Sequence, residues 1–91
     1  MKDTSSNDVA FVASSLRIGI VVSVYHSSVT ESLRDGALAA LSSVDIRGDD
    51  AVTVIDVPGA FEIPFAARRA AESGFFDAIV CLGCLIRGET P

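Results

Sequence analysis

The chain has 91 residues, twelve acidic against seven basic side chains, a net charge of −5 and an apolar fraction of 49%. This apolar fraction is typical of a folded domain and excludes an intrinsically disordered chain. The excess of acids argues against a protein that binds nucleic acid, because such binding needs clustered lysine and arginine. Apolar runs extend over only a few residues, so the sequence predicts no transmembrane helix and no membrane partner.

Residues 1–16 are predicted to form an arm that is partly disordered. Its first ten residues, MKDTSSNDVA, contain acids and lack the apolar segment of a secretory signal. The two cysteines of the chain are too few for a disulfide framework. This favours a reducing compartment, and we expect a cytoplasmic protein.

The first predicted strand spans residues 17–24, where β-branched and apolar residues follow one another without alternation. That pattern is typical of a strand buried on both faces of a parallel sheet. A helix follows, since Ser28 and Glu31 fit the S-x-x-E capping box. An apolar stripe repeats along it at Val29, Leu33, Ala37 and Leu41. Residues 42–50, rich in Ser, Asp and Gly, are predicted to be a loop.

A second strand is predicted over residues 51–57 and a second helix over residues 60–73, with Pro58 and Gly59 between them. Pro64 fits only the first turn of this helix, where a missing N–H removes no intrahelical hydrogen bond. Gly74 is a natural residue to end it. The stripe predicted to be buried consists of Ile63, Ala66, Ala67, Ala70 and Ala71.

Residues 77–86 are predicted to be a third strand, which gives the order β-α-β-α-β. Crossovers of this length make the strands parallel and place the helices on the sheet faces. The predicted fold class is therefore α/β, a three-layer αβα arrangement with a flavodoxin-like topology. In such sheets ligands bind beyond the carboxyl ends of the strands. We expect the chemistry at residues 25–26, 59–62 and 84–90.

Cys81 and Cys84 form a C-x-x-C motif, but they are predicted to be ordinary buried thiols. In a redox dithiol the first cysteine lies at a helix N-terminus, whereas both of these fall in the third predicted strand. Side chains alternate along a strand, so positions three apart point to opposite faces. Structural zinc would need two further ligands, and the chain offers only His26. No metal site is predicted.

The residues expected at the crevice leave alternatives open. Tyr25 either packs against the sheet rim or presents its face to a planar heterocycle, and for His26 a loop hydrogen bond is favoured over catalysis. Glu62 either stabilises a helix N-terminus through the dipole or faces a polyhydroxyl or carbonyl ligand. Arg87 and the residues after it suit a phosphate group. The sequence contains neither G-x-G-x-x-G nor a P-loop, so no nucleotide cofactor is predicted.

Taken together, these residues resemble the lumazine synthase family, in register from Arg17 to Pro91. The matching stretches are IGIVV at 18–22, Tyr25, Thr30, Gly36-Ala37, VPGAFEIP at 57–64, Asp77-Ala78 and LGCLIRGETP at 82–91. The resemblance implies the condensation of 5-amino-6-(D-ribitylamino)uracil with 3,4-dihydroxy-2-butanone 4-phosphate, the penultimate step of riboflavin biosynthesis. It implies neither a metal nor an organic cofactor.

The resemblance also implies a role for each matching residue of the site. Tyr25 would stack on the pyrimidine ring, and Ala60, Phe61 and Glu62 would line the ribityl chain. Backbone groups of Cys84, Leu85 and Ile86 would contact the ring edge. Glu89 and Thr90 would hold the butanone phosphate, with Arg87 nearby.

Two positions depart from the family pattern: His26 stands where most relatives have Asn, and Tyr25 replaces the commoner Phe or Trp. The acid/base histidine of the family directly follows the position of Pro91, so no catalytic side chain is expected within residues 1–91. Residues 17–91 would be the N-terminal part of a single domain, incomplete at its C-terminus. Residues 1–91 alone are expected to form negligible lumazine.

The resemblance further implies a homopentamer or a larger shell of pentamers, in which Val9 to Ala13 would be an added strand on a neighbouring subunit or a disordered arm. Two alternatives to the enzyme remain. One is a non-catalytic binding or shell-forming relative that keeps the crevice. The other is an unrelated flavodoxin-like module that binds phosphate or flavin.

Overall fold

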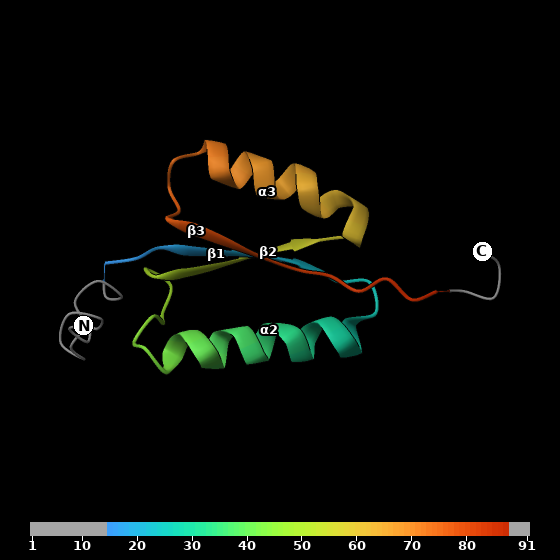
Figure 1. The fold of residues 1–91 in the computed structure, drawn as a ribbon, viewed down its shortest axis with the longest axis horizontal. Coiled ribbons are helices and arrows are strands. Elements are labelled where there is room, and N and C mark those ends of the chain that lie inside the picture. The colour runs from blue at the N-terminus through green and yellow to red at the C-terminus, as the bar shows by residue number, and fades with distance from the viewer. Residues whose placement is uncertain (1–14, 88–91) are drawn as a thin grey trace, which may run out of the picture.

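The computed structural model describes residues 15–87, which fold into a three-stranded sheet with one helix on each face (Figure 1). This confirms the predicted α/β class and the order of its elements. None of the helices in residues 15–87 has the length and apolar character needed to cross a membrane. Most of the predicted arm, including Val9 to Ala13, lies outside the described residues. The elements are β1 (Ile18–Ser23), α2 (Ser27–Ser42), β2 (Val52–Val57), the 3₁₀-helix η1 (Ala60–Glu62), α3 (Ile63–Glu72) and β3 (Ala78–Leu82).

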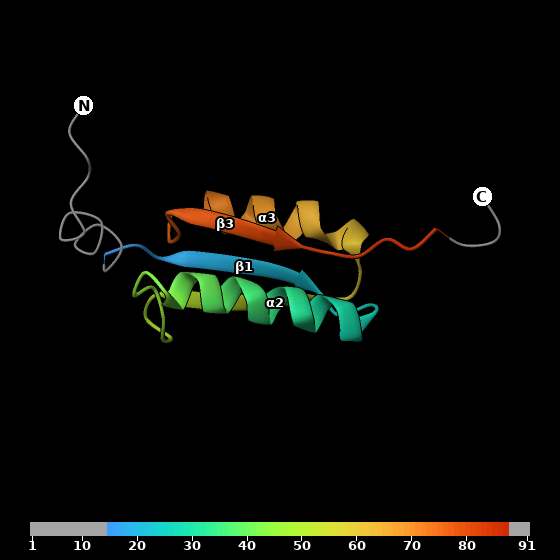
Figure 2. The ribbon, with the colours of Figure 1, turned by 60° about the horizontal axis from the view of Figure 1, so that its bottom comes forward.

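The sheet is parallel, with the strand order β2-β1-β3 and β1 in the centre. In the register, Val22 of β1 lies opposite Asp56 of β2 and Leu82 of β3. All three strands therefore end at the same edge, as the crossover argument predicts. Figure 2 shows β1 and β3 running side by side toward that edge.

The central strand carries the core. Every residue of β1 is buried, which confirms the prediction from its unbroken apolar run. The core cluster consists of Ile18, Ile20, Val22, Ile46 and Val52, with Leu38 and Leu41 of α2 packed against it. Burial of this apolar surface between the sheet and α2 is the main stabilising contribution in the described part of the chain.

The third strand is shorter than predicted, because β3 ends at Leu82 and residues 83–86 leave the sheet. Gly83 lies close to the α3 side of the molecule, where a Cβ atom would approach Ile63 Cδ1 to 2.8 Å. Among the described residues β3 is an edge strand, paired only with β1. No further ladder therefore holds residues 83–86 in line with the strand.

The predicted capping box at Ser28 and Glu31 is wrong. The structure begins α2 at Ser27, and His26 is the N-cap residue, with no side-chain hydrogen bond to the helix end. Ser28 thus lies inside the first turn, where its backbone is helical and its side chain cannot cap the amide three residues on. Its carbonyl oxygen instead accepts a hydrogen bond from the Ser32 hydroxyl at 3.2 Å.

The predicted apolar stripe of α2 is correct only in its second half. Ala37 and Leu41 pack against the core, but Val29 and Leu33 are each 41% exposed. Residues four apart drift by about 40° around a helix, because each residue turns about 100°. The early members of the series have therefore rotated off the sheet, and Thr30 takes the buried position there.

The second predicted helix consists of two parts, the single turn η1 and the α-helix α3. Pro64 lies in the first turn of α3, as predicted, and Ala70 is buried on the sheet side. Ala71, predicted to be buried, is exposed, because it lies about 100° further around the helix than Ala70.

Two glycines allow a matched test of backbone conformation. Gly74 has φ +72° just after α3, whereas Gly36 lies within α2 with open space around an added Cβ. Gly74→Ala is expected to lower the free energy of unfolding by about 1 kcal/mol, because a side chain disfavours the left-handed region. Gly36→Ala is expected to raise it by about 0.5–1 kcal/mol through helix propensity. Urea unfolding measures both changes. Changes of the same sign would contradict the placement of Gly74 in the left-handed region and of Gly36 within the helix.

Candidate functional site

The candidate site lies at the edge where the three strands end. Ser23 of β1 is paired in register with Val57 of β2, and the Val24 N–H donates to the Val57 carbonyl oxygen at 2.8 Å. β3 ends at Leu82, next to β1. The segments 24–26, 58–62 and 83–87 consequently leave the sheet at the same edge.

Tyr25 is 62% exposed immediately after β1. Its backbone N–H donates to Ser23 Oγ at 3.2 Å, and its ring lies 4.1 Å from the ring of His26, edge to face. A tyrosine packed against the sheet rim would be mostly buried. The exposure therefore favours an open ring face over a packing role.

The turn between β2 and α3 holds Glu62 close to Gly59. The Glu62 N–H donates to the Gly59 carbonyl oxygen at 3.1 Å, and a Cβ atom at Gly59 would lie 3.2 Å from Glu62 Oε1. The carboxylate therefore folds back over the turn, and a larger residue at position 59 would displace it. Ala60 is half-buried, while Phe61 is 86% exposed.

The exit of β3 runs alongside η1. A Cβ atom at Gly83 would lie 3.5 Å from Ala60 Cβ, so the two segments are in close approach. Beyond this point Cys84 is half-buried, and Leu85, Ile86 and Arg87 are exposed. The predicted residues Glu89 and Thr90 lie outside the described residues.

The two cysteines differ from the prediction of buried thiols within one strand. Cys81 is exposed on β3, and Cys84 lies beyond the end of that strand, half-buried. The physical reason is that β3 is an edge strand of the described sheet, so its side chains are only partly covered. Both cysteines are free thiols, and residues 15–87 contain no group of three His, Cys, Asp or Glu side chains placed to hold a metal ion.

A cavity of about 560 Å³ lies between β2 and α3. Val57, Phe65 and Phe76 give it an apolar lining, and Glu62 and Arg69 add a carboxylate and a guanidinium group. Phe65 and Arg69 were not predicted as site residues. The spacing of Glu62, Phe65 and Arg69 places them on one helical face, and this signal could have revealed them.

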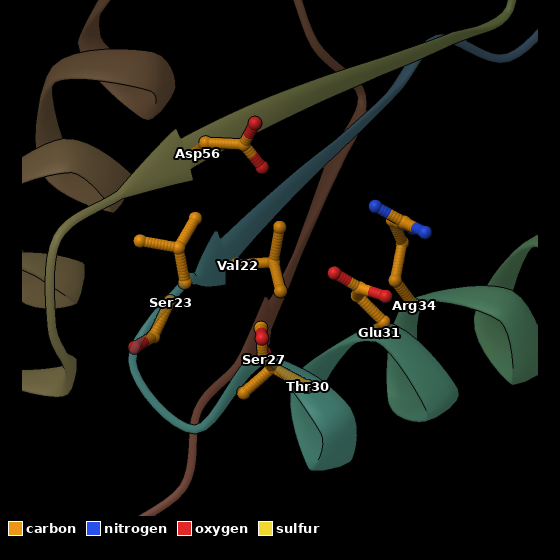
Figure 3. A pocket seen from close by; sticks show the side chains of 8 residues that line it. Val22, Ser23, Ser27, Thr30, Glu31, Arg34 and Asp56 are labelled. Carbon is orange, nitrogen blue, oxygen red and sulfur yellow. The ribbon is translucent and has the colours of Figure 1, made fainter.

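A smaller cavity of about 120 Å³ lies on the other face of the sheet, under α2. In Figure 3, Glu31 and Arg34 extend from α2 and Asp56 projects from β2, and Ser23 and Thr30 also line this cavity. Sequence reasoning missed this cavity, although an acid within a strand and an arginine on a half-buried helix position are weak signals of it.

The structure thus brings Tyr25, residues 60–62 and residues 83–87 to one edge. Glu62 lines the cavity under α3, whereas Tyr25 lines neither cavity and lies exposed next to Val24, which lines the one under α2. In a comparison with protein families, residues 15–91 match the model described as 6,7-dimethyl-8-ribityllumazine synthase. Because this match covers most of the sequence, the chain belongs to the 6,7-dimethyl-8-ribityllumazine synthase family.

Proposed function

We propose that the protein is a 6,7-dimethyl-8-ribityllumazine synthase, a transferase-class enzyme of riboflavin biosynthesis, to which residues 1–91 contribute substrate-binding residues and no acid/base side chain. The amine of 5-amino-6-(D-ribitylamino)uracil would condense with the ketone of 3,4-dihydroxy-2-butanone 4-phosphate to an imine. Elimination of phosphate, ring closure and loss of water would then give the lumazine. The observation that carries the proposal is the family match over residues 15–91.

Tyr25 is the proposed platform for the pyrimidine ring. Its exposed side chain at the end of β1 supports this role, because a flat ring face open to solvent can stack on a planar heterocycle. Backbone groups of Cys84, Leu85 and Ile86 are proposed to meet the polar edge of the same ring. The close approach of Gly83 to Ala60 supports a position of residues 84–86 near the turn that contains residues 60–62.

Glu62, with Ala60 and Phe61, is proposed to bind the ribityl chain. A carboxylate accepts hydrogen bonds from hydroxyl groups, and such charge-assisted bonds are stronger than neutral ones. The position of the Glu62 carboxylate over the Gly59 turn supports this role. Arg87, with Glu89 and Thr90 after it, is proposed to hold the phosphate of the second substrate.

The proposed contribution of these residues to the rate is orientation of the two substrates. Holding an amine and a ketone in contact can supply roughly 7–11 kcal/mol of a barrier. Proton transfer by a positioned acid or base adds about two to four orders of magnitude. We assign that role to none of residues 1–91, and the reaction as proposed uses no metal or organic cofactor.

Association into a homopentamer or a larger shell, in the cytoplasm, is part of the proposal. The exposure of large apolar side chains at the candidate site supports this association. Phe61 and Leu85 are mostly exposed in the single chain, and a neighbouring subunit would cover them. Analytical ultracentrifugation would test the association.

Calorimetric titration of the chain with 5-amino-6-(D-ribitylamino)uracil tests the proposal. The chain has one tyrosine and no tryptophan, so its intrinsic emission reports on Tyr25. Binding with quenching of this emission is the expected result. The Tyr25→Leu variant serves as the control and should bind more weakly.

Two outcomes would contradict the proposed enzymatic function. Tight binding of flavin mononucleotide without any response to the pyrimidine would indicate a flavin-binding module. Binding of the pyrimidine without lumazine formation, in a chain extended past Pro91 by a segment that begins with histidine, would indicate a non-catalytic relative.

A further inference from the structure

The turn between β1 and α2 contains a residue in an uncommon backbone conformation. His26 has φ 58° and ψ 54°, in the left-handed region that residues with a side chain rarely adopt. Asn, Asp and His tolerate this region better than other non-glycine residues. The conformation turns the chain from the end of β1 at Ser23 into the start of α2 at Ser27.

Hydrogen bonds from α2 hold the backbone of His26 in place. Its carbonyl oxygen accepts from the N–H of Val29 at 2.9 Å and from the N–H of Thr30 at 3.1 Å. The Thr30 hydroxyl adds a longer hydrogen bond of 3.5 Å to the same oxygen, and Thr30 is only 1% exposed. The left-handed residue is therefore fixed by a buried neighbour and is not free to relax.

A second buried hydroxyl holds Tyr25 from the other side. Ser23, which has no exposed surface, accepts a hydrogen bond from the Tyr25 N–H at 3.2 Å. The backbone of residues 25 and 26 is thus held between Ser23 at the end of β1 and Thr30 of α2. This leaves the side-chain torsions of Tyr25 as the freedom that remains at this position.

The His26 ring restricts that freedom. The two ring centroids are 4.1 Å apart at an interplanar angle of 64°, which is an edge-to-face contact. Aromatic pairs favour such a geometry over a face-to-face sandwich. Tyr25 is otherwise mostly exposed, so without this contact its side-chain rotamers would have similar free energies. The contact with His26 favours one of them.

We propose that His26 is a positioning residue, which orients the Tyr25 ring for a planar ligand through this edge-to-face contact and its left-handed backbone. The inference rests on the proposed function, because it takes Tyr25 as the platform for the pyrimidine ring. It assigns His26 no proton transfer and no contact with the substrate.

Proton NMR of the unchanged chain tests the ring contact directly. The sequence contains one tyrosine and one histidine, so cross-peaks between their ring protons are unambiguous. Strong nuclear Overhauser effects between the Tyr25 and His26 rings are the expected result. Their absence in the folded chain would overturn the inference, whatever the chain binds.

Two variants separate the ring of His26 from its backbone. His26→Asn and His26→Gly both accept the left-handed conformation, but neither has an aromatic ring. In both, the Tyr25 ring signals should shift, and the Kd for 5-amino-6-(D-ribitylamino)uracil should rise about two- to tenfold. The exposed first-turn change Ser28→Ala is the control and should leave both quantities unchanged.

Unchanged Tyr25 signals and an unchanged Kd in both variants would overturn the positioning role. If the unchanged chain binds no ribityl-pyrimidine, the proposed function fails. The orientation of Tyr25 by His26 is then still decided by the Overhauser effects and by the ring signals of the two variants.

Discussion

Ile20→Ala is expected to lower the free energy of unfolding by about 2–5 kcal/mol, the usual range for truncating a buried isoleucine to alanine. Ile20 has no exposed surface and lies on the central strand, in the cluster with Ile18 and Val22. Its removal leaves a cavity that the sheet cannot close, because β1 is hydrogen-bonded on both sides. Domains of this size are stable by only about 5–15 kcal/mol, so the loss is a large fraction of the total.

Urea unfolding followed by far-ultraviolet circular dichroism measures this change. Val54→Ala is the matched control, since Val54 is an aliphatic strand residue on β2 that is 39% exposed. It should lower the free energy of unfolding by less than about 1 kcal/mol. Equal losses in the two variants would contradict the placement of the core around β1.

Glu62→Gln is expected to raise the Kd for 5-amino-6-(D-ribitylamino)uracil by about three- to twelvefold. Hydrogen bonds to a charged group contribute about 1.5–3 kcal/mol and are roughly twice as strong as neutral ones, so about half of this energy is lost, and each 1.4 kcal/mol corresponds to a factor of ten. Glutamine keeps the size of the side chain and one acceptor oxygen over the Gly59 turn. The change therefore removes the charge while leaving the local fold in place.

Calorimetric titration of Glu62→Gln beside Glu72→Gln checks this role. Glu72 is an exposed acid at the far end of α3, where its carboxylate pairs with Arg68 at 3.0 Å. Its variant should bind the pyrimidine as the unchanged chain does. A Kd that is the same in both variants would remove Glu62 from the ribityl site.

Local patterns were sufficient to predict the order of the elements and the common edge of the strands. The unbroken apolar run of residues 18–22 predicts a strand buried on both faces of the sheet, and the structure buries each of these residues. Pro64 and Gly74 predict where α3 starts and stops, because each restricts the backbone by itself. These sequence signals predict the structure correctly because they depend on the local backbone and on few contacts with distant residues.

The failures have tertiary causes. Ser28 and Glu31 satisfy a capping motif, but α2 starts earlier because the carbonyl oxygen of the left-handed His26 already accepts hydrogen bonds from Val29 and Thr30. β3 stops at Leu82, where the chain passes close to α3. Neither event leaves a periodic pattern in the sequence.

The candidate site was predictable to a similar extent. Tyr25 and Glu62 follow strand ends, so topology alone predicts that they lie at the edge where the strands end. The cavity linings combine residues from separate elements, such as Arg34 of α2 with Asp56 of β2, and require the packed structure.

Because the strands are parallel, the candidate site and the connection from α2 to β2 lie at opposite ends of this small domain. The connection from α2 to β2, residues 43–51, lies at the starts of the strands, about 20 Å of strand length away from Tyr25 and Glu62. Ile46 anchors its first half in the core, while Asp49 is exposed. An epitope or a fluorescent reporter inserted at Asp49 would therefore lie far from a ligand bound at the candidate site. The same loop is a suitable position for immobilising the chain.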